Sequence, residues 1–215
     1  MVERTATVNL MRALLFEYGI TVPVGRKVFE RNLPSILDDA ENVLPDFIRA
    51  LVFRLRERWQ HIDVQIDEMS EQLQHASIAS EKCQLIYSVP GIGPIAATGL
   101  IAAVGSGTQF KRGRDMSAWL GLVPRQYSTG GRSNLGGISK RGNVYLRSQV
   151  IQGAKALKIH MKRDKSALGP WIAKLEATHH HHVVLIALAN KIMSICWKIL
   201  TSGQEYQHYP ISAVK

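Results

Sequence analysis

The sequence has few of the features that mark secreted, metal-binding and membrane proteins. Its 215 residues include two cysteines, Cys83 and Cys196, and no CxxC or Cys/His spacing, so neither a disulfide framework nor a zinc site is indicated. No apolar run approaches the roughly 20 residues that span a bilayer, and the N-terminus has no signal-peptide core. We therefore expect a cytoplasmic protein without a membrane partner.

Acidic residues are scarce in one part of the chain. Between Lys111 and Lys165 the only acids are Asp115 and Asp164, while the whole chain carries a formal net charge of +10. A basic block that coincides with glycine-rich loops favours a polyanionic partner, nucleic acid above all. The alternative is a solvated basic surface without such a partner.

Hydrophobic periodicity predicts a mainly α-helical protein with two parts, of which residues 1–80 form a helical arm. Helices are expected over residues 2–18 and 34–42, and a long helix is expected after Pro45. Apolar residues recur along the long helix every three or four positions. This heptad-like seam consists of Leu51, Leu55, Trp59, Ile62, Ile66, Met69 and Leu73. It suits either packing within one chain or a coiled-coil-like contact between two chains.

The second part, residues 81–203, is expected to be a compact helical domain, followed by a tail over residues 204–215. The predicted helices cover residues 81–88, 94–104, 114–121, 143–163, 168–177 and 182–201. No strand pattern is strong enough to predict a sheet, although residues 122–123 or 126–127 could pair briefly.

A turn between the first two helices of this domain is similar to a helix-hairpin-helix element, which contacts the DNA backbone without reading its sequence. The segment runs Val89-Pro-Gly-Ile-Gly-Pro94. Gly91 and Gly93 permit a tight turn with bare N–H groups, and Pro94 begins a helix whose positive end faces a phosphate. Because the turn has no Lys or Arg, a purely structural corner is the alternative.

Residues 124–143 combine glycine, hydroxyl and basic side chains. Ser128 is a candidate nucleophile that attacks a phosphodiester and forms a phosphoserine link to DNA. No neighbouring His or Asp supplies a base, but phosphoryl transfer depends mainly on positioning and charge neutralisation. The alternative is ordinary turn chemistry, with Thr129, Ser133 and Ser139 as competing hydroxyls. The candidate nucleic-acid-binding residues are Gly91, Gly93, Lys111, Arg112, Arg114, Arg125, Arg132, Lys140, Arg141 and Arg147.

No metal site is predicted. The histidine run at residues 179–182 could bind metal, but consecutive rings on a helix point to several sides, so surface histidines are the favoured interpretation. The acidic residues of the arm are not taken as metal ligands either. These are Asp38, Asp39, Asp63, Asp67 and Glu68.

Five motifs, taken in order, resemble the C-terminal part of insertion-sequence 110 family transposases. They are Val-Pro-Gly-Ile-Gly-Pro (89–94), Ala-Trp-Leu-Gly-Leu-Val-Pro (118–124), Ser-Thr-Gly-Gly (128–131), Gly-Ile-Ser-Lys-Arg-Gly-Asn (137–143) with Leu146 and Arg147, and Val-Leu-Ile-Ala-Leu-Ala-Asn-Lys (184–191) before Trp197. The likeness covers residues 85–200, and residues 1–80 look like the helical linker that precedes this domain in the family.

The resemblance implies an RNA-guided DNA recombinase with two half-sites. One is an upstream RuvC-like domain whose four carboxylates bind Mg²⁺, and the other is a C-terminal domain that provides a serine nucleophile. Ser128 matches the family's serine, and Arg125, Arg132 and Arg147 would neutralise the phosphate.

In members of that family, the carboxylate domain lies upstream of the segment that corresponds to Met1 and the residues after it. We therefore expect a transposase fragment that binds DNA and guide RNA, needs no cofactor of its own, and does not complete transposition alone. A homo-oligomer through the helical arm is also expected. The alternative is a non-catalytic DNA- or RNA-binding helix-hairpin-helix module in which Ser128 is a turn residue.

Overall fold

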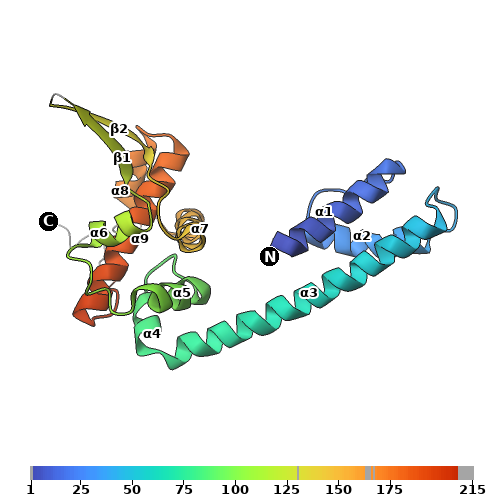
Figure 1. Ribbon diagram of the computed structural model, residues 1–215, viewed down its shortest axis with the longest axis horizontal. Coiled ribbons are helices and arrows are strands. Elements are labelled where there is room, and N and C mark those ends of the chain that lie inside the picture. Colours follow the sequence, from blue (N-terminus) through green and yellow to red (C-terminus); the bar gives the residue numbers. More distant parts are fainter. Residues whose placement is uncertain (1, 130, 163–165, 167, 208–215) are drawn as a thin grey trace. The chain divides into compact units, whose positions relative to one another are not determined.

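A computed structural model describes residues 2–129, 131–162, 166 and 168–207. These residues form nine α-helices and one antiparallel two-stranded hairpin, which confirms the mainly helical class (Figure 1). The chain divides into two compact units, unit 1 (Met1–Gln72) and unit 2 (Leu73–Lys215). The division lies inside one long helix, whereas the sequence pattern placed the boundary between residues 80 and 81.

Unit 1 contains helices α1 (Val2–Glu17), α2 (Arg26–Asp38) and most of α3 (Asp46–Ala79). The predicted first helix and the long helix after Pro45 are both confirmed. Their apolar faces meet in one buried cluster. It consists of Val8, Met11 and Leu15 from α1, Phe29, Leu33 and Leu37 from α2, and Leu44, Ile48, Val52 and Trp59 from the segment that leads into and forms α3.

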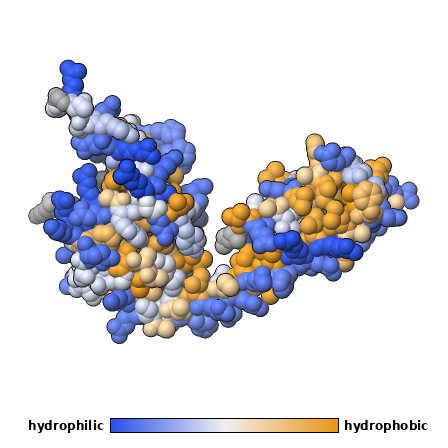
Figure 2. All heavy atoms as spheres, viewed as in Figure 1, coloured by the Kyte–Doolittle hydropathy of each residue, from blue (hydrophilic) through white to orange (hydrophobic). Residues whose placement is uncertain are grey.

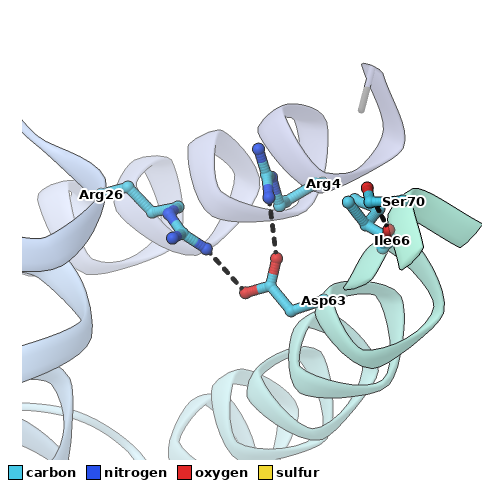
Figure 3. Close-up of polar contacts among 5 residues, drawn as sticks. All are labelled: Arg4, Arg26, Asp63, Ile66 and Ser70. Atoms are coloured by element: carbon cyan, nitrogen blue, oxygen red, sulfur yellow. Dashed lines mark hydrogen bonds and ion pairs between the residues drawn. The ribbon is translucent and has the colours of Figure 1, made fainter. Parts of the chain in front are cut away.

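Asp63 of α3 joins the other two helices of this unit. One of its carboxylate oxygens accepts a hydrogen bond from Nη1 of Arg4 at 3.0 Å, and the other accepts from Nη1 of Arg26 at 2.9 Å (Figure 3). One turn farther along α3, the Ser70 hydroxyl donates to the Ile66 carbonyl at 2.6 Å. Asp63 therefore serves as an ionic junction of the three helices.

The prediction of a short helix over residues 34–42 is wrong in its limits, because α2 begins eight residues earlier and includes Pro34. Proline usually starts a helix or stops one, since it lacks an N–H group. Here Phe29, Leu33 and Leu37 repeat every four residues and are all buried. Their burial outweighs the one missing hydrogen bond.

The predicted seam on the long helix is only partly the face that unit 1 buries. Trp59 and Ile62 are buried, but Leu51 is 42% exposed and Met69 is 65% exposed. Val52, next to Leu51, is fully buried instead. The packing face is shifted because α1 and α2 cover α3 from a side that periodicity alone could not identify.

Unit 2 is built around its last helix. Its helices are α4 (Glu81–Tyr87), α5 (Pro94–Val104), α6 (Gly113–Trp119), α7 (Val144–His160), α8 (Leu168–Glu176) and α9 (His181–Ser202). All six lie within about three residues of the predicted ranges. Helix α9 packs against α4, α6, α7 and α8, and it contributes more core side chains than any other helix of the unit.

Helix α9 is also long and apolar enough to cross a membrane by length and composition, with a mean hydropathy of 1.8 over its most apolar window. Half of that window is buried inside unit 2, as is usual for a core helix. Cys196 lies at the centre of this packing, and desolvation by burial raises the pKa of its thiol to about 12. The thiol is therefore protonated and inert at neutral pH.

The glycine-rich segment contains a hairpin that the sequence analysis did not predict, although it allowed a brief pairing at residues 126–127. Strands β1 (Pro124–Thr129) and β2 (Arg132–Ile138) pair antiparallel and project from the helices of unit 2 (Figure 1). Every residue of β1 is exposed. The strands were missed because neither face is buried, so the apolar alternation that marks most strands is absent.

Candidate nucleic-acid interface

The two strands form a narrow ribbon, which we define as residues 124–129 and 132–138. Ser128 pairs with Ser133 and Thr129 with Arg132, while Gln126 pairs with Leu135. The register shifts by one residue between Pro124 and Gln126, where Arg125 lies opposite residues 136–137. In Figure 2 this part of the visible surface is mainly hydrophilic.

The two faces of the ribbon differ in charge. Because neighbouring side chains of a strand point to opposite faces, Ser128 and Gln126 share one face, whereas Arg125 and Arg132 belong to the other. The ribbon therefore does not place its arginines on the same face as Ser128, where they could neutralise the phosphate that Ser128 attacks. It presents a hydroxyl on one side and two guanidinium groups on the other.

Ser128 is exposed, and its hydroxyl is held by one neighbour on its own strand. The Gln126 amide Nε2 donates to Ser128 Oγ at 2.7 Å. This bond uses an oxygen lone pair and fixes the direction of the side chain, while the hydroxyl proton remains able to donate. Among the described residues, no histidine or carboxylate makes a hydrogen bond to Ser128.

The ribbon is rooted in a tight neck, which we define as residues 119–123 and 139–142. The Ser139 N–H donates to the Val123 carbonyl at 2.9 Å, and the Lys140 N–H donates to the Gly121 carbonyl at 3.2 Å. Gly121 and Gly142 both have positive φ angles, of 73° and 84°. A Cβ at Gly121 would overlap the backbone of Arg141, so the two segments can approach this closely only as glycine backbone.

Arg147 binds two carbonyl groups of the neck. It lies in the first turn of α7, is 8% exposed, and its Nη1 donates to the carbonyls of Leu120 and Arg141, each at 3.0 Å. A buried guanidinium is stable only when carbonyls or carboxylates satisfy it, as they do here. Arg147 was predicted as a phosphate ligand, but the structure shows it binding the protein backbone.

The other predicted cations near the ribbon are exposed. Arg125 Nη2 donates to the Ser139 carbonyl at 3.2 Å, which holds this side chain along the base of the ribbon. Arg132, Lys140 and Arg141 are exposed, and Lys140 has a positive φ angle of 56° although it is not glycine. Lys140 and Arg141 are exposed residues of the neck, so this end of unit 2 carries several solvent-facing positive charges.

The turn between α4 and α5 is confirmed as a helical hairpin, and it packs on α7 through two glycines. A Cβ on Gly91 would lie 2.9 Å from the Gly153 carbonyl oxygen, and a Cβ on Gly153 would overlap the Gly91 carbonyl. Gly91 is thus needed for packing, whatever it binds. Gly93 is exposed, precedes Pro94 at the start of α5, and has no atom within 4 Å of its would-be Cβ.

A second basic segment, Lys111, Arg112 and Arg114, is exposed at the start of α6. Arg112 forms an ion pair with Asp115 at 3.5 Å. The segment is anchored by the Trp197 indole N–H, which donates to the Phe110 carbonyl at 3.0 Å. Its backbone is therefore fixed to α9, while its charged side chains face solvent.

Histidines 179–182 are exposed at the start of α9. Within the part of the chain that the structure describes, no three His, Cys, Asp or Glu side chains come together as a metal-binding group.

Sequence reasoning missed several residues that shape this interface: Gly121, Gln126 and Gly153. One signal could have revealed the ribbon. Two glycines between Thr129 and Arg132 form a two-residue connection of the kind that favours a β-hairpin. The Gly91 to Gly153 contact, in contrast, joins residues far apart in the chain and leaves no local pattern.

Comparison with known proteins identifies the family of this chain. Residues 83–168, which include the α4–α5 turn, the ribbon, the neck and α7, match the family described as "Transposase IS116/IS110/IS902 family". The chain is also 40% identical, over 95% of its length, to the transposase for insertion sequence element IS1111A from Coxiella burnetii. The chain belongs to the IS116/IS110/IS902 transposase family.

Other family members give the same picture. The chain is 38% identical to the transposase for insertion sequence element IS1328 from Yersinia enterocolitica, over 94% of this chain and 59% of that protein. It is also 38% identical to a "Probable family 20 transposase" from Pseudomonas aeruginosa, over 95% of this chain and 61% of that protein. The IS1111A transposase is covered over 56% of its length, so the chain spans between half and two thirds of these relatives.

Proposed function

We propose that this chain is the DNA-binding, serine-bearing part of an insertion-sequence transposase, with Ser128 as the nucleophile of strand exchange. The observation that carries the proposal is the position of Ser128. Its hydroxyl is exposed on a ribbon that projects from unit 2, and that ribbon is rooted in a closely packed neck. An exposed hydroxyl on a rigidly rooted ribbon can reach a phosphodiester that the helical core cannot approach.

In the proposed reaction, Ser128 Oγ attacks the phosphorus of a DNA backbone phosphate. A phosphoserine bond forms as the bond to one sugar oxygen breaks, the hydroxyl proton leaves Oγ, and the departing sugar oxygen accepts a proton. The energy of the broken bond is retained in the phosphoserine, so the strands can be rejoined without ATP. Gln126 would orient Oγ for attack, because its amide already donates to that atom.

The division of the ribbon into two faces suggests separate roles for its residues. The major groove of DNA admits a two-stranded β-ribbon. Arg125 and Arg132 would grip one backbone from their face, while Ser128 meets a phosphate on the other. Neutralisation of the attacked phosphate and acceptance of the Oγ proton would then depend on groups outside this ribbon.

The α4–α5 turn and the basic start of α6 would provide further backbone contacts, to DNA or to a guide RNA. Gly93 is open, and Lys111, Arg112 and Arg114 face solvent on a segment anchored to α9. These contacts would hold either nucleic acid through phosphates, without reading its sequence.

The remaining parts of the proposal concern the whole transposase. An upstream carboxylate domain would bind Mg²⁺ and supply the second half-site, so this chain alone would not complete transposition. The arm would join subunits, since unit 1 leaves large apolar side chains exposed, among them Phe16, Phe47, Leu51 and Phe53. Figure 2 shows hydrophobic patches on the visible surface of this unit. Such a DNA-processing protein would work in the cytoplasm.

The alternative function is a non-catalytic nucleic-acid-binding module, and one observation favours it. The arginines of the ribbon lie on the face opposite Ser128, so this ribbon alone does not build a phosphate pocket around the hydroxyl. In that case Gln126 and Ser128 simply complete a polar hairpin.

The Ser128→Ala variant of the complete transposase that contains this sequence separates the two functions. Incubation with radiolabelled target DNA, followed by denaturing electrophoresis, should show a covalent protein–DNA adduct for the parent protein and none for the variant. DNA affinity should be unchanged, since the hydroxyl contributes one contact among many. Thr129→Val and Ser139→Ala are the matched controls, and both should form the adduct. A persistent adduct in Ser128→Ala would refute the serine mechanism.

A further inference from the structure

A basic pocket in unit 2 belongs to none of the features described so far. It lies between α7, α8 and the N-terminal end of α9 and has a volume of about 630 Å³. Its lining includes Lys155, Lys158, Lys162, Glu176, His181 and Leu185. Lys155 and Lys158 lie three residues apart on one side of α7, and Lys162 follows the C-cap of that helix, Met161.

The charges in this pocket are not balanced. Lys158 Nζ pairs with Glu176 at 2.9 Å, and both side chains are largely buried. Glu176 is the one carboxylate in the lining, while Lys155 and Lys162 have no carboxylate partner among the described residues. The ion pair fixes α8 against α7, and the two other ammonium groups remain available to an anion.

His181 lines the same pocket and lies close to its positive charges. Partial desolvation lowers its pKa, and the positive charges of His182, Lys158, His180 and Lys155 lower it further. His181 is also the first residue of α9, a helix without any acidic residue in its first turn. The positive end of the helix dipole therefore adds to the lysine charges at the same place.

We propose that this pocket binds a phosphate of a nucleic-acid backbone, as a contact separate from the ribbon. The inference rests on the proposed nucleic-acid binding of the chain and names a further part of the surface that performs it. Lysines act as point charges toward phosphate, so the contact would add affinity without sequence preference.

The geometry of α7 supports a backbone phosphate rather than a small free anion. The helix begins at the neck of the ribbon and ends at the pocket, and its 17 residues span about 25 Å. That length corresponds to about seven base pairs, at roughly 3.4 Å for each. One nucleic acid lying along α7 could thus contact the neck cations and the pocket together.

Binding should depend on pH through His181. The charged and titratable groups that face it are Lys155 and Lys158 from α7, Lys162 just after α7, Glu176 from α8, the N-cap His180, and His182 from α9. A bound phosphate offsets the positive charges that depress the pKa of His181, so that pKa rises in the complex. The complex then takes up a proton, and affinity increases as pH falls between the pKa of the complex and that of the free protein.

The test compares two double variants of the 215-residue chain in binding to a fluorescent DNA duplex and a single-stranded RNA. Lys155→Gln/Lys162→Gln removes the two unpaired pocket charges and leaves the Lys158 to Glu176 pair intact. Lys27→Gln/Lys198→Gln removes two exposed lysines elsewhere and is the matched control. Circular dichroism melts verify that both fold as the parent does.

The pocket variant should raise Kd about tenfold at roughly 0.1 M salt, and it should reduce the slope of log K against log salt for the duplex by between about 1 and 2. The control should change Kd less than about twofold. Equal losses in the two variants would overturn the pocket and leave the proposed function intact. A parent chain that binds neither nucleic acid would instead refute the proposed binding function, and the pocket with it.

Two further experiments test which anion the pocket binds and whether His181 takes up the proton. Inorganic phosphate that binds the pocket more tightly than either nucleic acid would identify a free-anion site and overturn the inference. His181→Asn should flatten the pH dependence of Kd, whereas His61→Asn, an exposed histidine of unit 1, should retain it. An unchanged pH dependence in His181→Asn would contradict the assigned proton uptake.

Discussion

The ribbon and its neck both contain glycine and arginine but have opposite physical characters. In the ribbon, Arg132 is exposed and Gly137 has open space around it. In the neck, Gly142 has no room for a Cβ, and below it Arg147 is buried among carbonyls. One stretch of glycine and arginine thus provides both an open binding surface and a closed mechanical support.

The comparison teaches that residue type does not assign a role within such a stretch. A glycine can be needed for its size, for its φ angle, or for neither, and an arginine can bind a ligand or its own backbone. The contacts of each residue decide between these cases, and three substitutions test the assignments in order of expected effect.

Gly142→Ala should have the largest effect. The new Cβ would overlap the Trp119 carbonyl oxygen, and a φ angle of 84° is unfavourable for alanine. The free energy of unfolding should fall by about 3 kcal/mol, measured by urea denaturation. Gly137→Ala is the matched control and should change stability by less than about 0.5 kcal/mol. Equal effects in the two variants would show that the neck is no tighter than the ribbon.

Arg147→Met should have an intermediate effect on stability. It removes both hydrogen bonds to the Leu120 and Arg141 carbonyls, and unfolding should become about 2 kcal/mol easier. The control Arg141→Met, at an exposed side chain, should leave the melting temperature nearly unchanged and weaken DNA binding instead. If Arg147→Met weakened binding without loss of stability, Arg147 would be the phosphate ligand that its sequence position suggested.

Arg132→Gln should have the smallest effect, and it should appear only in binding. Because Arg132 is exposed at the end of the ribbon, its loss should leave the thermal melt unchanged. The slope of log K against log salt for duplex DNA should decrease by about 1, as expected for one lost phosphate contact. Lys27→Gln serves as the control in fluorescence anisotropy, and a slope equal to that of this control would remove Arg132 from the interface.

Much of the helical fold could be predicted because buried helices leave a periodic apolar pattern. Leu185, Leu188 and Ile192 repeat at helical spacing, and they lie in the core as that spacing indicates. The ribbon could not be found in this way, since it buries no face. Pro34 misled the prediction of α2 because a local preference was outweighed by burial of the surrounding stripe.

The candidate site was only partly accessible from the sequence. The family resemblance favoured Ser128 as the nucleophile. Spacing alone did not distinguish it from the other hydroxyls of the loop. The separation of Ser128 from Arg132 depends on strand register, and the burial of Arg147 depends on carbonyls that another segment supplies. The pocket could not be predicted from its lysines, because α8 and α9 bring Glu176 and His181 to them only in the folded protein.

The direct backbone contact of Gly91 with Gly153 has a consequence for how force passes through the domain. No side chain lies between these two residues to absorb a displacement, so the α4–α5 turn moves with α7. Arg147, six residues earlier on the same helix, fastens the other end. Helix α7 therefore acts as a stiff spacer of about 9 Å between these two contacts. A nucleic-acid strand that pulled on the α4–α5 turn would transmit this force to the base of the ribbon.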